Sequence, residues 1–145
     1  MNFLRLFDDW ANTETHQAGT VIFSDSEPAD ALFVVLEGEV ALSLRGDALS
    51  SERRGALIGE MAIIDDAPRS ETATALSTVR LARISPEEFR DLVTDNPEFS
   101  LHAMAELARR LRPRFHPRRT GRFHPGPGWL RSAAGSRPLI FREPL

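Results

Sequence analysis

Two side chains of opposite charge stand close together in a short stretch that is rich in glycine and small residues. The stretch runs from Gly55 to Leu76 and contains Glu60 directly after Gly59, and Arg69 directly after Pro68. Arginine presents a planar set of N–H donors that matches a phosphate, whereas an ionised carboxylate can only accept hydrogen bonds. The pair therefore predicts a site for a ligand that offers a phosphate and a sugar hydroxyl together.

The residues between Glu60 and Arg69 favour an anion site at the start of a short helix. The apolar run from Met61 to Ile64 predicts one helical turn after Gly59. Backbone N–H groups at a helix start attract negative charge. The adjacent Asp65–Asp66 pair is typical of a solvated turn rather than of a cation site. An ion pair between Glu60 and Arg69 that only braces the turn is the structural alternative.

This stretch resembles the phosphate-binding cassette of the cyclic nucleotide-binding domains, a family that includes the catabolite activator protein and the regulatory subunits of cyclic AMP-dependent kinase. Its G-E-M-A-I-I-x-x-x-P-R-S matches the family's G-E-[LM]-[AS]-L-[LIF]-x-x-x-P-R-[SAT], including the interval from Glu to Arg. The resemblance begins at Ala18 and extends to about Arg112. It implies an antiparallel jelly roll, that is, a double-stranded β-helix.

The same resemblance implies the ligand and the roles of the side chains. The ligand is expected to be a cyclic nucleotide, cyclic AMP rather than cyclic GMP, and no cofactor or metal is expected. Glu60 would bind the ribose 2′-hydroxyl, Arg69 would bind the phosphate oxygens, and nearby amides would complete the phosphate site. The predicted ligand-binding residues are Gly59, Glu60, Met61, Ala62, Arg69 and Ser70.

Two positions depart from the family pattern. The family has a small residue two positions after the arginine, and this chain has Glu71. Strand alternation would place Glu71 on the face of Arg69, where it would repel an anionic ligand, whereas a break in phase at Pro68 would turn it to solvent. The second departure is Ser26, where the family has a turn glycine; a left-handed serine there would cost about 1 kcal/mol.

The rest of the chain up to Arg112 predicts a mainly β domain with flanking helices. Short apolar runs separated by glycine-bearing turns are typical of a closed antiparallel sandwich or barrel. Ser85, followed by Pro86 and Glu88, predicts a helix start with a capping box. The expected elements are an amphipathic helix at Asn2 to Trp10 that covers the barrel, strands at Val21–Phe23, Ala31–Leu36, Val40–Leu44, Glu71–Leu76 and Val79–Ile84, a polar loop at Arg45–Arg54, and helices after Ser85 and Asn96.

Charge and composition divide the chain into residues 1–112 and a tail at 113–145. The first part, with its β-roll at about 18–84 and helices at about 85–112, has 11 arginines against 20 acidic residues. The tail has seven arginines against one glutamate and is rich in Pro and Gly, which predicts an irregular or disordered segment. Pro113 is expected to interrupt the last helix. Nucleic acid could be bound only through the tail, because an acidic body repels it.

These features favour a cytoplasmic sensor or regulatory module that changes conformation when ligand binds. There is no cysteine, no stretch long enough to span a membrane, and no catalytic motif of an enzyme. The expected partners are a second copy of the chain, through the C-terminal helix, and an unknown protein. Two alternatives remain open. One is a degenerate barrel that serves protein interaction, and the other is a Crp/Fnr-like transcription regulator without its own DNA-binding domain.

Overall fold

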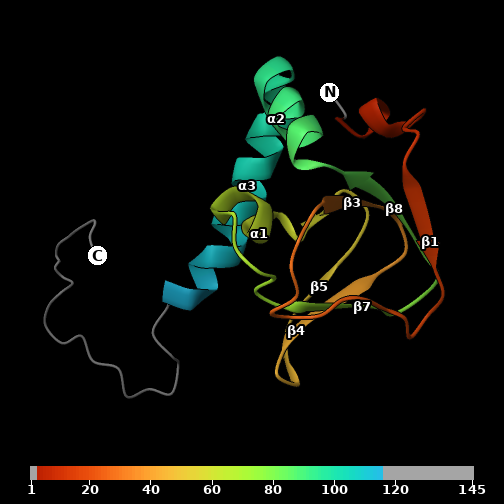
Figure 1. The fold of residues 1–145 in the computed structure, drawn as a ribbon, viewed down its shortest axis with the longest axis vertical. Coiled ribbons are helices and arrows are strands. Elements are labelled where there is room, and N and C mark those ends of the chain that lie inside the picture. Colours follow the sequence, from red (N-terminus) through yellow and green to blue (C-terminus); the bar gives the residue numbers. More distant parts are fainter. Residues whose placement is uncertain (1–2, 116–145) are drawn as a thin grey trace, which may run out of the picture. The chain divides into compact units, whose positions relative to one another are not determined.

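A computed structural model describes residues 3–115, which form two four-stranded antiparallel sheets with flanking helices (Figure 1). One sheet has the strand order β1-β8-β3-β6 and the other has the order β2-β7-β4-β5. The elements are η1 (Phe3–Phe7), β1 (Thr13–His16), β2 (Val21–Phe23), β3 (Leu32–Glu37), β4 (Val40–Leu44), β5 (Asp47–Glu52), β6 (Leu57–Ile58), α1 (Glu60–Asp65), β7 (Thr72–Ala75), β8 (Val79–Ile84), α2 (Pro86–Asp95) and α3 (Pro97–Phe115). This arrangement confirms the predicted mainly β jelly roll.

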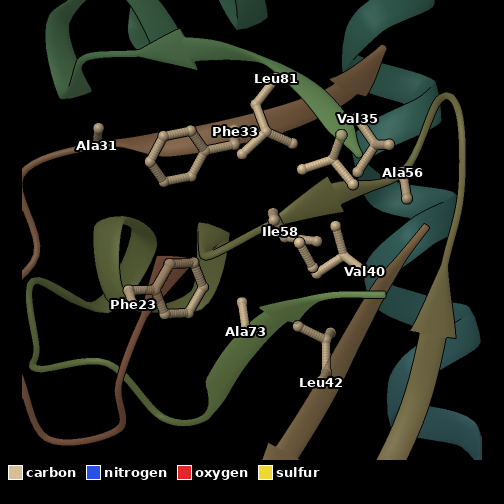
Figure 2. Packing of buried hydrophobic residues seen from close by; sticks show 12 residues of the cluster. Phe23, Ala31, Phe33, Val35, Val40, Leu42, Ala56, Ile58, Ala73 and Leu81 are labelled. Atoms are coloured by element: carbon tan, nitrogen blue, oxygen red, sulfur yellow. The ribbon is translucent and has the colours of Figure 1, made fainter. Parts of the chain in front are cut away.

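The space between the two sheets is filled by apolar side chains that point toward one another (Figure 2). Phe33 and Val35 of β3 and Leu81 of β8 enter from one sheet. Val40 and Leu42 of β4 enter from the other, where alternate residues of the strand are buried. Alternation of this kind is what a half-buried strand requires. The predicted period-2 pattern of β4 is therefore confirmed.

A second apolar cluster covers the other face of the sheet that contains β3. Leu32 and Val34 of β3 point into it, so successive residues of this strand serve two different cores. Phe3 and Phe7 of η1 and Phe99 of α3 pack in the same cluster. Burial on both faces explains why β3 is a continuous apolar run rather than an alternating one. It also confirms that the N-terminal segment packs on the barrel as a lid.

Local signals predicted the α2 start well. Ser85 Oγ accepts a hydrogen bond from the Glu88 N–H, and the Glu88 carboxylate accepts one from the Ser85 N–H. Pro86 occupies the first turn, where a missing N–H has no consequence. The predicted capping box is therefore confirmed.

Three sequence predictions about element boundaries were wrong. Residues 45–54 are not a loop, because β5 forms a hairpin with β4 around Arg45–Gly46, both of which have positive φ angles of 51° and 86°. The roll begins at Thr13 rather than near residue 18, since β1 pairs with β8. The last helix passes Pro113 and ends at Phe115. Proline has a helical φ and removes one hydrogen bond of the ladder, which a helix close to its end tolerates.

Of the predicted tail at 113–145, residues 116–145 lie outside the described residues. The division between residues 1–112 and 113–145 therefore stays a prediction. The compact unit that ends at Leu107 contains both sheets.

Replacing Ser26 by glycine should stabilise the domain. Ser26 has a φ of 70°, the left-handed conformation that its turn requires, and its N–H donates to the Arg69 carbonyl at 2.8 Å. Glycine adopts this φ without the Cβ penalty, so the free energy of unfolding should rise by about 1 kcal/mol. Urea denaturation measures the change. Ser43→Gly in the interior of β4 is the control and should lower stability by about 0.5–1 kcal/mol; equal effects of the two variants would contradict the explanation.

Candidate functional site

The turn that begins α1 can be built only with a glycine. Gly59 is the N-terminal cap of α1 and has a φ of 78°. A Cβ atom at this position would lie 2.5 Å from Arg69 Nη1 and 3.2 Å from Phe23 Cε2. The positive φ and the close approach of the arginine both exclude other residues. The glycine of the predicted cassette is therefore a spatial requirement of the Arg69 side chain.

The Arg69 side chain is buried against the backbone of two different segments. Its Nη1–H donates to the Gly59 carbonyl at 3.1 Å, and its Nη2–H donates to the Ala31 carbonyl at 2.8 Å. Only 6% of the residue is exposed, and the guanidinium carbon lies 4.1 Å from the centroid of the Phe23 ring. Such stacking is a favourable cation–π contact. Among the described residues, none accepts a hydrogen bond from the buried Arg69 Nε.

The backbone around Arg69 is held as firmly as its side chain. The Arg69 N–H donates to the Glu27 carbonyl, and the Arg69 carbonyl accepts from the Ser26 N–H, each at 2.8 Å. These two bonds join the residue to the turn between β2 and β3. The donor groups of Arg69 are consequently presented from a fixed backbone position.

Arg69 is a desolvated cation among carboxylates. Burial lowers the pKa of its guanidinium, while the charges of Asp30, Glu27 and Glu71 act in the opposite direction and raise it. Arginine remains protonated at any physiological pH despite such a shift. A buried positive charge attracts an anion more strongly than an exposed one, because less water screens it. The site is therefore suited to a small anionic group.

The other predicted site residues lie along the same segment. Glu60 is the first residue of α1 and only 1% exposed. Met61 is half-buried and Ala62 is buried, and the Ala62 carbonyl accepts the N–H groups of Asp66 and Ala67 that end the helix. Ser70 is exposed, and its hydroxyl donates to Glu71 Oε1 at 3.3 Å. Their contacts with a ligand stay predictions.

Glu71 is buried, as is Arg69 two residues before it. It is 7% exposed, and buried residues alternate from Arg69 through Glu71 to Ala73 and Ala75 of β7. Of the two orientations considered from the sequence, the solvent-facing one is therefore wrong. The negative charge of Glu71 acts on Arg69 and raises its pKa, against the lowering by burial.

Sequence reasoning missed Phe23 and Ala31, which complete the surroundings of Arg69. Ala31 is 38 residues away from Arg69 in the sequence, and it contributes only its backbone carbonyl. No side-chain type can signal such a contact. Phe23 was predicted as part of a buried strand, but nothing in the sequence pairs its ring with an arginine on another strand.

Helix α3 contacts the segment that leads into the cassette. His102 Nε2–H donates to the Gly55 carbonyl at 2.6 Å, and its ring stacks on Phe3 with 4.1 Å between centroids. The Leu57 N–H donates to Glu106 Oε1 at 3.3 Å. His102 and Glu106 lie one turn apart on the same helix face. The start of β6, and through it Gly59, is thus bonded directly to α3.

Two absences hold for residues 3–115. No group of three or more acidic or histidine side chains there could hold a metal ion. No helix in this part of the chain is both long and apolar enough to cross a membrane.

Comparisons with known proteins agree with this geometry. Residues 13–96 match the family model of the cyclic nucleotide-binding domain. The chain is 31% identical over 99 residues to a CRP-like cAMP-activated global transcriptional regulator of Mycobacterium tuberculosis, covering 65% of this chain and 44% of the relative. It is 37% identical over 86 residues to a cyclic nucleotide-gated potassium channel of Mesorhizobium japonicum, covering 59% of this chain and 24% of the channel. The chain thus spans less than half of either curated relative.

Among solved structures, the chain is similar to the catabolite activator protein of Thermus thermophilus. The TM-score is 0.65 at 28% identity, and the match covers 77% of this chain and 55% of the other. The matched family model spans both sheets, the cassette and α2. The chain therefore belongs to the family of cyclic nucleotide-binding domains.

Proposed function

We propose that this chain is a sensor module that binds a cyclic nucleotide, cyclic AMP in preference to cyclic GMP. The observation that carries the proposal is the buried Arg69, whose guanidinium lies against the Gly59 turn of the cassette. A phosphate at this turn would meet the arginine donors and the first amides of α1 together. Glu60, buried next to Gly59, would accept a hydrogen bond from the ribose 2′-hydroxyl.

The preference for cyclic AMP is supported by a relative. The relative from Mycobacterium tuberculosis is by name activated by cAMP. Ser70 does not decide the base, because its hydroxyl could also contact the amine of a syn-oriented guanine, as the resemblance implies for threonine in members that prefer cyclic GMP. The exposed Ser70 hydroxyl lies next to Arg69 in the chain, where it would contact the phosphate.

The regulatory step we propose is a shift between two conformations that differ in the position of α3. A phosphate that binds the remaining donors of Arg69 would pull on a side chain that also holds the Gly59 and Ala31 carbonyls, so we expect the cassette to move when ligand binds. The contacts of His102 with Gly55 and of Glu106 with Leu57 carry that movement to α3. A ligand shifts such an equilibrium only as far as it binds one state more tightly than the other.

The partner we propose for α3 is a second copy of the chain. Leu101 is 63% exposed and Met104 is 57% exposed. Residues three positions apart share a helix face, and this face lies opposite the one with His102 and Glu106. Dimerisation would cover the two apolar side chains and would place the dimer contact on the helix that the cassette moves.

A protein-interaction module that has lost its ligand is the second candidate. It is favoured by Glu71, whose inward carboxylate adds negative charge to an anion site. This module would keep the fold and lack nucleotide binding. The titration described next separates the two candidates.

Replacing Arg69 by alanine should weaken the binding of cyclic AMP by about 30-fold to several thousand-fold. Removing one partner of a buried, hydrogen-bonded charge pair typically costs about 2–5 kcal/mol. Calorimetric titration with cyclic AMP and cyclic GMP measures the effect and the base preference. Arg80→Ala is the control, because the Arg80 side chain is 43% exposed and pairs with Glu37 at 3.5 Å. Absence of binding to the wild-type chain at millimolar nucleotide would favour the interaction module.

Ligand binding should change the hydrogen exchange of α3, and Glu106→Ala should reduce that change. The substitution removes the carboxylate that accepts the Leu57 N–H, so movement of β6 would no longer reach the helix through this bond. Exchange mass spectrometry with and without saturating cyclic AMP measures both effects. Glu87→Ala on the exposed face of α2 is the control. Identical protection of residues 85–112 with and without ligand would contradict the proposed mechanism.

Charged substitutions on the exposed face of α3 should dissociate the dimer. Aspartate at Leu101 and Met104 replaces two exposed apolar side chains by charges, which would repel each other across a symmetric interface. Sedimentation equilibrium at micromolar concentrations should give a dimer for the wild type and a monomer for the double variant. Leu49→Asp on β5, where the leucine is 48% exposed, should leave the dimer intact. A monomeric wild type would refute the proposed partner.

A further inference from the structure

The carboxylate of Glu71 is a buried charge that the proposed ligand assignment does not use. Glu71 is 7% exposed, and buried residues alternate from Arg69 through Glu71 to Ala73 and Ala75 of β7. The Ser70 hydroxyl donates to the Glu71 carboxylate at 3.3 Å. A solvated carboxylate would have little effect on the binding of an anion, because water screens it. A buried carboxylate acts more strongly on an anion that is bound next to Arg69.

The negative charge of Glu71 acts electrostatically on the Arg69 guanidinium. It is one of the carboxylates that raise the pKa of Arg69. A group that stabilises the guanidinium cation through its negative charge destabilises an anion at the same place. The repulsion is proportional to the charge that the anion carries.

Nucleotides differ in that charge according to how the phosphate is esterified. A cyclic phosphodiester carries one negative charge, whereas a terminal phosphomonoester such as that of 5′-AMP carries about 1.5 to 2 at neutral pH. A fixed carboxylate in the site therefore repels the phosphomonoester about twice as strongly. Both ligands would use the same donors of Arg69, so attraction by the arginine alone favours the more highly charged one.

We propose that Glu71 is a specificity-determining residue that acts as a charge filter. It admits a singly charged cyclic phosphodiester and disfavours doubly charged phosphomonoesters of the same nucleoside. The inference rests on the proposed function of the cassette. It explains why an acidic side chain can occupy the inward face of an anion site without abolishing that site, because the loss of affinity for the cyclic nucleotide is the smaller of the two losses.

The variant Glu71→Gln tests the filter. Glutamine has nearly the shape of glutamate and can still accept the Ser70 hydroxyl, but it carries no charge. We expect the affinity for cyclic AMP to rise about tenfold and the affinity for 5′-AMP to rise about a hundredfold. The repulsion by a partly screened carboxylate is about twice as large for a ligand with two negative charges as for a ligand with one. The preference for cyclic AMP over 5′-AMP should therefore fall about tenfold. Calorimetry or a competition assay measures both ligands.

A singly charged open-chain nucleotide separates charge from shape. The methyl ester of 5′-AMP has one negative charge and no cyclic phosphate, so the filter predicts that its affinity rises about tenfold in Glu71→Gln, as for cyclic AMP. Glu87→Gln is the control. Glu87 is solvent-exposed on α2 and is not among the charges that shift the pKa of Arg69, so its neutralisation should change affinities less than about twofold.

The outcomes distinguish the filter from the function on which it rests. The filter is overturned if Glu71→Gln raises the affinities for cyclic AMP and 5′-AMP by equal factors, or if the variant binds cyclic AMP more weakly than the wild type. Either result leaves nucleotide binding itself in place. If neither the wild type nor the folded Glu71→Gln variant binds any of the three nucleotides, the proposed function itself fails. Circular dichroism and thermal unfolding of the variant confirm that it is folded.

Discussion

The burial of the Arg69 guanidinium is the constraint on which the cassette depends. A desolvated cation must be given acceptors, and this one takes the carbonyls of Gly59 and Ala31, which belong to two separate segments of the fold. The arginine needs the space that a side chain at residue 59 would fill, and it needs the Phe23 ring beneath it. One side chain thus fixes the helix start, the end of β2 and the entry to β3 relative to one another.

Strand β3 connects the surroundings of Arg69 to both apolar cores of the domain. Its inward residues Phe33 and Val35 line the core between the sheets, and its outward residues Leu32 and Val34 pack with η1 and α3. Packed cores rearrange between discrete states rather than deform continuously, because close packing leaves little free volume. A displacement of the cassette would therefore disturb the packing on both faces of β3. The two bonds from α3 to Gly55 and Leu57 would give the proposed displacement a direct polar route.

The sequence predicted elements that carry their own signals and missed those that depend on partners. The α2 capping box and the alternation of β4 follow from local chemistry, whereas the left-handed conformation of Ser26 was expected from the family's glycine at that position. Strand β5 was missed because its DALSSE segment has little β-propensity and is held by pairing with β4, although Arg45–Gly46 could have indicated a two-residue turn. Within the site, the types and spacing of Glu60 and Arg69 were readable. The carbonyl of Ala31, the ring of Phe23 and the direction of Glu71 were not, because each depends on how distant segments meet.

The electrostatics of the site favour discrimination over affinity. The carboxylates of Asp30, Glu27 and Glu71 surround the arginine, in a body that is acidic as a whole. Each of them stabilises the buried cation and weakens its attraction for an anion, so together they offset only part of the desolvation of Arg69, whose pKa stays lowered. Water and salt screen the exposed carboxylates and weaken both effects. A buried carboxylate is screened less, and its repulsion of a bound ligand would depend directly on the charge of that ligand. Specificity is a difference between affinities, and a fixed repulsive charge widens that difference when the competing ligands differ in charge.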